Sequence, residues 1–144
     1  PDATAETLDS DGWLHTGDMG RLVGGLLYVV DRKKDIIITG GENVSSLEVE
    51  TAVLEHPNVA RVAVVGVPDP KWGENVCAVV VATPGLEIDT AEIVAFVRQK
   101  LAGFKVPRHI VVVDELPVTG SGKVVKAEIR ERLAQNPELL GNRL

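Results

Sequence analysis

Two valine-rich runs lie close together near the middle of the chain. They span residues 59–67 and 75–82, and almost every position in them is apolar. A strand with one exposed face alternates polar and apolar residues, whereas a near-continuous β-branched run is typical of a strand covered on both faces. The loop over residues 68–74, which contains two prolines and a glycine, joins the runs. They therefore predict two central strands of a sheet that is covered on both faces.

A capping box marks the start of the first predicted helix. Ser45 is followed three residues later by Glu48, so the serine oxygen can accept a helix N–H while the glutamate reaches back to the cap. Apolar residues then repeat at helical spacing on one stripe, which His56 extends, and Pro57 stops the pattern. We therefore expect a helix over residues 47–55.

Two more helices and another strand are expected downstream. A helix capped by Asp89 or Thr90 is expected to end at Gly103, and helical character returns over residues 126–133. Residues 109–113 predict a strand. Strands interleaved with helices in so short a chain indicate an α+β lobe, with a roughly three-stranded central sheet flanked by helices.

Short strands are also predicted before this lobe. Residues 21–23 and 26–30 surround Gly24-Gly25, which is the pattern of a β-hairpin with a two-residue turn. Residues 36–39 indicate a short buried strand that Gly40-Gly41 ends. The lobe should therefore be preceded by a hairpin.

Composition excludes several classes of protein. The 144 residues are 44 % hydrophobic and carry a formal net charge of −6, which suits a globular domain and not a nucleic-acid surface with clustered Lys and Arg. The single cysteine, Cys77, allows no disulfide within the chain. No apolar run approaches the ~20 residues of a membrane span, and no signal segment opens the chain. We expect a cytoplasmic protein with no nucleic-acid partner and no integral membrane segment.

A glycine-flanked lysine is the most prominent polar feature. Lys123 follows Gly120-Ser121-Gly122, but a phosphate-binding loop would need a glycine in place of Pro117 and a hydroxyl in place of Val124. The sequence therefore does not favour a nucleotide-wrapping loop. The three histidines lie on unrelated elements without ligand-spaced partners, so we expect no metal site in this chain.

Several short stretches, read together in order, closely resemble the carboxy-terminal part of AMP-forming acyl-CoA synthetases. These are adenylate-forming enzymes that include fatty-acid and aryl-acid CoA ligases. The resemblance covers nearly the whole chain, and its specificity comes from having five or more stretches in family order. The matching stretches are residues 11–18 (DGWLHTGD), 31–37 (DRKKDII), 40–44 (GGENV), 66–69 with 73–74 (GVPD and GE), 105–107 (KVP) and 116–123 (LPVTGSGK).

The resemblance implies a reaction in two steps. A carboxylic acid, expected to be a fatty acid, is activated with ATP and Mg²⁺ to an acyl-adenylate; the lobe then rotates, and the acyl group passes to coenzyme A. By this resemblance, residues 1–33 are the hairpin edge of a large adenylation domain and residues 34–144 are the mobile lobe. The lobe's partner would be that amino-terminal domain, which would hold most of the ATP and Mg²⁺ contacts. This chain alone is expected to be inactive.

The resemblance also implies roles for four polar residues. Asp18 would accept hydrogen bonds from both ribose hydroxyls of the nucleotide, as a two-oxygen acceptor can, and Arg32 would support the same ribose. Lys34 would be the hinge between the hairpin and the lobe. Lys123 would be catalytic, placing its ammonium beside the substrate carboxylate and the α-phosphate as negative charge gathers there.

A second group of residues is implied to face the ligands after the rotation. Gly40, Gly41, Glu42 and Asn43 match the loop that faces the adenylate and lines the path of coenzyme A, where glycines allow close approach of backbone. Arg98 corresponds in position to a residue that meets a coenzyme A phosphate in some members.

The alternative is a freestanding, non-catalytic binding module that retains the lobe fold. The intact Asp18 and Lys123, and a first residue, Pro1, that is not methionine, favour the enzyme lobe. The reading frame upstream of Pro1 would discriminate between the two.

Overall fold

The computed structural model describes residues 4 and 7–141 and divides the chain into two compact units. The first unit is Pro1–Lys34 and the second is Asp35–Leu144. The division lies one residue beyond the boundary expected from the sequence. That the first unit belongs to a larger adenylation domain stays a prediction.

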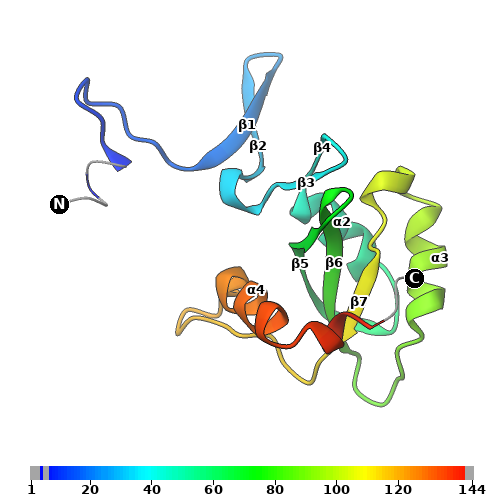
Figure 1. Cartoon of the computed structure of the whole chain (residues 1–144). Helices are drawn as coiled ribbons and strands as arrows, with labels where there is room; N and C mark the ends of the chain where they lie inside the picture. The colour runs from blue at the N-terminus through cyan, green and yellow to red at the C-terminus, as the bar shows by residue number, and fades with distance from the viewer. Residues whose placement is uncertain (1–3, 5–6, 142–144) are drawn as a thin grey trace. The chain divides into compact units, whose positions relative to one another are not determined.

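The first unit contains an antiparallel hairpin of two strands, β1 (Asp18–Val23) and β2 (Leu26–Arg32). Gly24 and Gly25 form its turn, with φ of 56° and 81°. Two successive positive φ values are what a two-residue turn needs to match the twist of the strands, and glycine supplies them without strain. The predicted hairpin is confirmed, and both strands are longer than expected (Figure 1).

The apolar side chains of this hairpin are exposed on both of its faces. Leu22 is 73 % exposed, Leu27 71 % and Val29 62 %. A two-stranded hairpin has no core of its own, so nothing within it can cover these side chains. The other exposed apolar residues of the hairpin are Met19, Val23, Leu26, Tyr28 and Val30.

The second unit is built on a mixed sheet of five strands. β6 lies at its centre, antiparallel to β5 and parallel to β7, and its start pairs with β3 through Thr39 and Gly73. The three predicted central strands are confirmed, and the short β3–β4 hairpin adds two. The strands are β3 (Ile37–Thr39), β4 (Glu42–Val44), β5 (Val59–Asp69), β6 (Gly73–Ala82) and β7 (His109–Val112).

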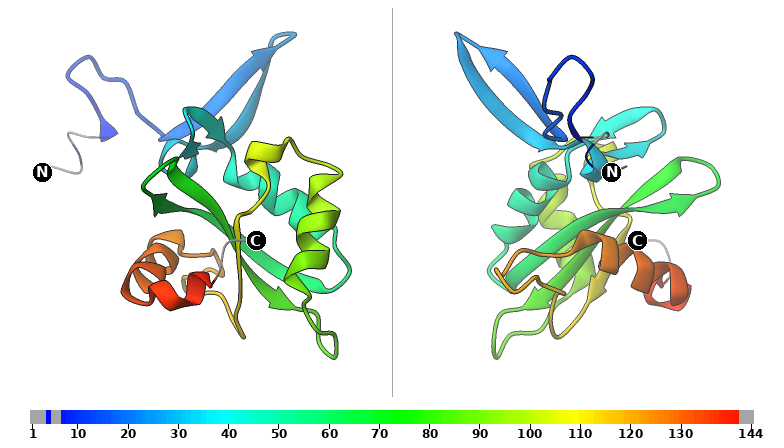
Figure 2. Two further views of the ribbon diagram at one scale, coloured as in Figure 1. Left: turned by 45° about the vertical axis from the view of Figure 1, so that its right-hand side comes forward. Right: turned by 90° about the vertical axis from the view of Figure 1, so that its left-hand side faces the viewer.

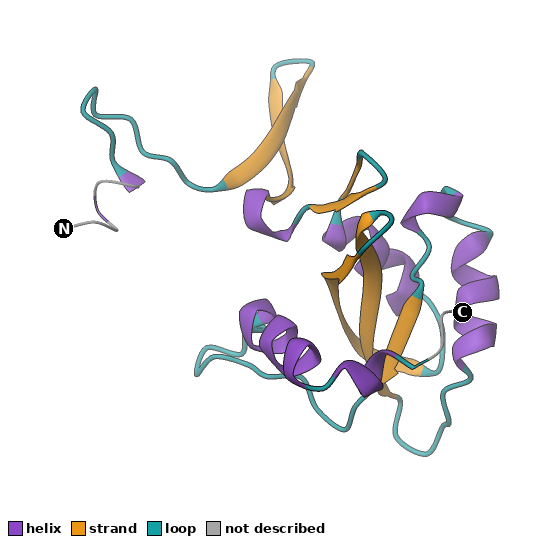
Figure 3. Ribbon diagram, in the orientation of Figure 1, coloured by secondary structure: helices purple, strands orange, loops and turns teal. Residues whose placement is uncertain are grey.

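Helices cover both faces of this sheet (Figure 2). α2 and α3 pack on one face and α4 on the other, and Figure 3 shows the strands enclosed between them. The α-helices are α2 (Ser46–Leu54), α3 (Thr90–Arg98) and α4 (Lys126–Gln135). Three 3₁₀ turns join the other elements: η1 (Lys33–Asp35), η2 (Gly103–Lys105) and η3 (Pro137–Leu140).

Alternate residues of β5 and β6 supply two separate cores. Val64 and Val80 are fully buried under α2 and α3, whereas Val65 and Cys77 are fully buried on the face that α4 covers. Successive side chains of a strand point to opposite faces. The near-continuous valine runs are thus explained, and the prediction of strands covered on both faces is confirmed.

The helix starts follow the predicted caps, but one helix end does not. Ser45 Oγ accepts from the backbone N–H of Glu48 at 3.3 Å, and Asp89 caps α3. The prediction that α3 ends at Gly103 is wrong, because the helix ends at Arg98. The backbone then tightens, with Lys100 N donating to Val97 O three residues earlier at 2.9 Å, and partly buried Leu101 still packs against the core.

Candidate functional site

Asp18 and Arg32 lie directly opposite each other in the first unit. They are register partners of β1 and β2, and Arg32 Nε is 3.3 Å from Asp18 Oδ1. Thr16 Oγ1 accepts from the backbone N–H of Asp18 at 3.1 Å, which orients the turn before β1. The hairpin thus brings together two residues that were predicted to share one ribose.

Arg32 lines an open hollow of about 560 Å³ on the first unit, and Asp18 lines a second open hollow of about 570 Å³ that shares Thr16, Gly17 and Lys33 with the first. The lining of the first hollow includes Thr16, Gly17, Arg32, Lys33 and Lys34, three of which are cationic. About a third of the Asp18 side chain, 34 %, stays exposed, so its carboxylate is accessible to a ligand. A planar carboxylate can accept from both hydroxyls of a diol, and the cations suit the charge of a nucleotide.

Lys34 lies between two anchored residues. On one side, Lys33 donates its backbone N–H to Gly17 O at 2.8 Å within the first unit. On the other side, Asp35 is buried and accepts from Arg130 Nη2 at 2.9 Å within the second unit. Exposed Lys34 is the last residue of the first unit. This position suits a hinge, and that role stays a prediction.

The turn between β3 and β4 contains Gly40 and Gly41, with φ of 59° and 85°. Gly40 N donates to Trp72 O at 2.8 Å, and a Cβ on Gly40 would meet the Trp72 ring at 2.9 Å. The sequence places Trp72 in the loop over residues 68–74 and carries no sign of this contact. Glu42 and Asn43 follow as exposed residues of β4.

Lys123 projects from a small, well-bonded hairpin. Thr119 O accepts from Gly122 N, and Thr119 N donates to Lys123 O, both at 2.8 Å. Thr119 Oγ1 also accepts from Lys123 N at 3.2 Å. Val118 and Val124 form a bridge at the base. The segment that carries Lys123 is therefore a hydrogen-bonded turn, and the Lys123 side chain is exposed on it.

The structure does not bring all predicted site residues together. The hairpin of Lys123 precedes α4, whereas the Gly40-Gly41 turn lies at the far end of the β3–β4 hairpin, well away from it (Figures 1 and 2). Arg98 is exposed in the last turn of α3. Its contact with a coenzyme A phosphate stays a prediction.

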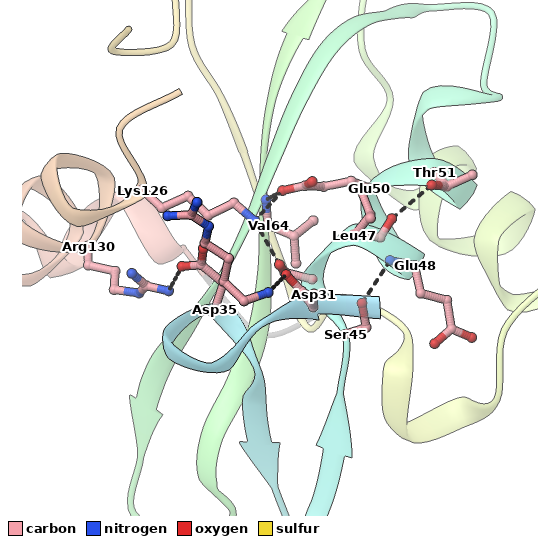
Figure 4. A network of polar contacts seen from close by, with 12 residues as sticks. Asp31, Asp35, Ser45, Leu47, Glu48, Glu50, Thr51, Val64, Lys126 and Arg130 are labelled. Carbon is pink, nitrogen blue, oxygen red and sulfur yellow. Dashed lines mark hydrogen bonds and ion pairs between the residues drawn. The ribbon is translucent and has the colours of Figure 1, made fainter. Parts of the chain in front are cut away.

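A polar network around α4 was not expected from the sequence. Lys126 Nζ lies 2.7 Å from both Glu50 Oε1 and Ser46 Oγ of α2, and Arg130 binds Asp35 (Figure 4). The partners are 76 to 95 residues apart in the sequence, so no local pattern could have paired them.

The cysteine and the possible metal ligands of the described residues form no second candidate site. Burial raises the pKa of the Cys77 thiol to about 12, so the thiol stays protonated and unreactive in the core. Within residues 4 and 7–141, no group of three or more His, Cys, Asp or Glu is arranged to hold a metal ion. In the same residues, no helix is long and apolar enough to cross a membrane.

The family described as "AMP-binding enzyme C-terminal domain" matches residues 48–123. The chain belongs to this family. The match includes β5, β6 and α3 and ends at Lys123. The resemblance found in the sequence is thereby confirmed.

Relatives of this chain include proteins that are named as CoA synthases or CoA ligases. A feruloyl-CoA synthase of Amycolatopsis sp. is 52 % identical over 133 residues, which cover 92 % of this chain and 27 % of the relative. A medium/long-chain-fatty-acid–CoA ligase of Mycobacterium tuberculosis is 52 % identical over 140 residues, which cover 92 % of this chain and 24 % of the relative. The chain thus spans about a quarter of the length of these relatives.

Solved structures share the fold. ATP-bound MatB of Rhodopseudomonas palustris superposes with a TM-score of 0.84 at 39 % identity, over 92 % of this chain and 27 % of that one. The o-succinylbenzoate CoA synthetase of Bacillus subtilis, in complex with its acyl-adenylate intermediate, gives 0.82 at 37 % identity, over 90 % and 27 %. The predicted α+β lobe is therefore the fold of this family.

Proposed function

We propose that this chain is the carboxy-terminal catalytic lobe of an AMP-forming acyl-CoA synthetase. The observation that carries the proposal is the alignment of 92 % of the chain with a feruloyl-CoA synthase and a fatty-acid–CoA ligase. The paired Asp18 and Arg32 and the exposed Lys123 give that alignment a chemical basis.

In the first step, a substrate carboxylate oxygen attacks the α-phosphorus of ATP. The bond from that phosphorus to the bridging oxygen breaks, and pyrophosphate leaves. Asp18 and Arg32 hold the ribose, and the Lys123 ammonium stabilises the charge that gathers on the reacting oxygens. A preorganised turn suits this task, because a charge already in place need not be reoriented during the reaction.

In the second step, the thiolate of coenzyme A attacks the acyl carbon, and the bond from that carbon to the AMP oxygen breaks. Lys34 is the hinge about which the lobe rotates between the two steps. The rotation replaces the hairpin of Lys123 with the turn of Gly40, Gly41, Glu42 and Asn43. The separation of these two segments on the lobe favours such an alternation, since one orientation could not present both. Arg98 is proposed to meet a coenzyme A phosphate.

The first unit is proposed to be the edge of a large adenylation domain. Its exposed apolar hairpin suits burial against such a partner, since an uncovered apolar surface of this kind marks an interaction site. By the family resemblance, we assign Mg²⁺ to the partner domain. The names of the relatives cover feruloyl, fatty-acid and trans-cinnamate substrates. A fatty-acid substrate, and a cytoplasmic location, stay predictions.

The test is to replace the matching carboxy-terminal part of the feruloyl-CoA synthase relative with this chain. The fusion should release pyrophosphate in the presence of feruloyl substrate and ATP and then form the CoA thioester. The relative's large domain alone and the 144-residue chain alone should do neither. A fusion that folds but forms no adenylate would contradict the proposal and favour a binding module.

Substitution of the hinge gives a second test in the same fusion. Proline holds φ near −65°, so Lys34→Pro should fix one of the two backbone states that the hinge needs. We expect one half-reaction to be lost much more than the other. Lys34→Ala, which removes the side chain but leaves the backbone free to rotate, is the matched control. Equal losses of both half-reactions would contradict the hinge assignment.

A further inference from the structure

Helix α4 is tied to the rest of the second unit at two successive turns. Lys126 and Arg130 lie four residues apart, which places them on one side of the helix. Lys126 Nζ is 2.7 Å from Glu50 Oε1, and Arg130 Nη2 is 2.9 Å from Asp35 Oδ1. Figure 4 shows both contacts. One helix therefore holds both α2 and the segment that follows Lys34.

These two ion pairs are the most enclosed among those of the described residues. Lys126 and Glu50 are only 17 % and 19 % exposed, and Arg130 and Asp35 32 % and 12 %. In every other pair at least one partner is more than a third exposed. Enclosed charges are less screened by solvent and salt, so their geometry is held more firmly.

Glu50 connects Lys126 to the backbone of the sheet. Its Oε1 also accepts from the backbone N–H of Val64 at 2.8 Å, on the outer side of the edge strand β5. Ser46, fully buried at the start of α2, gives Lys126 a second acceptor one turn earlier. The ammonium of Lys126 is thus located against α2 and β5 together.

Lys126 stands three residues after Lys123, and the connection between them is short and bonded. Val125 N donates to Pro117 O at 2.9 Å, and the bonds of Thr119 close the turn above it. Little of this segment can move unless the start of α4 moves. The position of the Lys123 ammonium therefore depends on where Lys126 is held.

We propose that Lys126 and Glu50 are positioning residues for Lys123, and that Asp35 and Arg130 extend this frame to the residue after the hinge. This inference rests on the proposed function for its consequence in catalysis. When the lobe rotates about Lys34, the frame makes Lys123 follow the hinge as part of one rigid body. The frame affects the rate through the position of Lys123.

The geometric part is tested on the 144-residue chain by NMR relaxation of the amides of residues 120–123. In Lys126→Met, we expect the order parameters of this turn to fall from about 0.85 toward 0.6 or below. Lys126→Arg, which keeps the charge, should retain most of the order. Glu50→Gln can still accept from Val64 N and removes only the charge, so it decides the question if Lys126→Met does not fold.

The matched control is Arg132→Met. Arg132 pairs with Glu128 on the same helix, but this pair is exposed, at 56 % and 44 %, and reaches no other element. Arg132→Met should leave the order parameters of the turn unchanged. The proposal is overturned if the turn keeps its order in both Lys126→Met and Glu50→Gln, that is, if these variants match the unchanged chain and Arg132→Met.

The catalytic part is tested in the fusion by measuring the two half-reactions separately. Misplacement by about 1 Å can lower a rate by ~10²-fold, so Lys126→Met should slow adenylate formation by about 10- to 100-fold with little change in the KM for ATP. Thioester formation from supplied acyl-adenylate should be unaffected. Equal losses in both steps would indicate a merely structural role and overturn the proposal. An unmodified fusion without adenylation would contradict the proposed function, while the NMR comparison would still decide the role of Lys126.

Discussion

Two antiparallel hairpins of this chain, β1–β2 and β5–β6, contrast sharply. β1–β2 and β5–β6 are both rich in valine and leucine or alanine, and both join neighbouring strands through a short turn. In β5–β6, Val64, Val65 and Val80 are fully buried, whereas Val29 of β2 is 62 % exposed. The difference lies within each unit, because α2, α3 and α4 cover β5–β6 inside the second unit.

This contrast shows that apolar content alone does not distinguish a core from an interface. The second unit encloses two cores made from residues of its own. The first unit has apolar strands and nothing in its described part to cover them. A closed core indicates a unit that folds independently, whereas an uncovered apolar hairpin indicates a surface made for a partner.

Separating the two units should produce the largest effect. A fragment of residues 35–144 should fold and unfold cooperatively, because both cores lie within it, whereas the peptide of residues 1–34 should be unfolded, since an isolated hairpin is marginal in water. Circular dichroism and NMR on the two pieces measure this. A folded short peptide, or an unfolded long fragment, would break the comparison.

Lys123 is also exposed, but a different role is proposed for it than for the apolar side chains of β1–β2. Its exposed side chain is proposed to act in chemistry and not in docking, so Lys123→Ala should slow adenylate formation by ~10²- to 10³-fold, about 3–4 kcal/mol in activation free energy. The melting temperature should stay nearly constant, because an exposed lysine loses little burial on truncation. A lower melting temperature with unchanged adenylation in the fusion would make Lys123 a structural residue.

Two valine substitutions compare the hairpins directly. Val80→Ala in β6 should lower the free energy of unfolding of the chain by about 2 kcal/mol, from lost burial and the cavity left behind. Val29→Ala in β2 should change it by less than about 0.5 kcal/mol. Urea unfolding of the two variants gives both numbers. In the fusion, Val29→Ala should become costly if a large domain covers the hairpin, and an unchanged cost there would count against that docking.

Alkaline pH should give the smallest effect. The pKa of Cys77 is raised by burial from 9.0 to about 12, so above pH 9 the unfolded chain releases a proton that the folded chain keeps. The contribution is fully present below pH 9 and is lost as pH rises toward 12, by about 1.4 kcal/mol at pH 10. Cys77→Ala should therefore lose less stability between pH 8 and 10 than the unchanged chain. Equal losses would mean that the thiol is not enclosed.

Much of the fold could be predicted because its signals are local. The valine runs, the caps at Ser45 and Asp89 and the Gly24-Gly25 turn each depend on neighbouring residues, and each is found as expected. The predicted end of α3 was wrong because the backbone turns to i→i−3 hydrogen bonds after Arg98, which no residue pattern there signals. β4 was not predicted because three residues carry too little pattern.

Residues of the candidate site could be predicted from the sequence only where they belong to a recognised motif. Asp18 and Arg32 belong to recognisable stretches, and the hairpin register places them together. Lys126, Glu50 and Trp72 belong to contacts between distant elements, which depend on how the helices pack on the sheet. Spacing along the chain carries no information about such pairs.

The turn between β3 and β4 has a consequence for sequence variation. At Gly41 only the backbone conformation resists a side chain, since nothing lies within 4 Å of a Cβ there, and asparagine tolerates such a conformation better than most residues. At Gly40 φ is also positive, and in addition a Cβ would lie 2.9 Å from the Trp72 ring. Among functional variants from a saturation library, position 41 should accept asparagine, whereas position 40 should accept another residue only when position 72 changes to a smaller one.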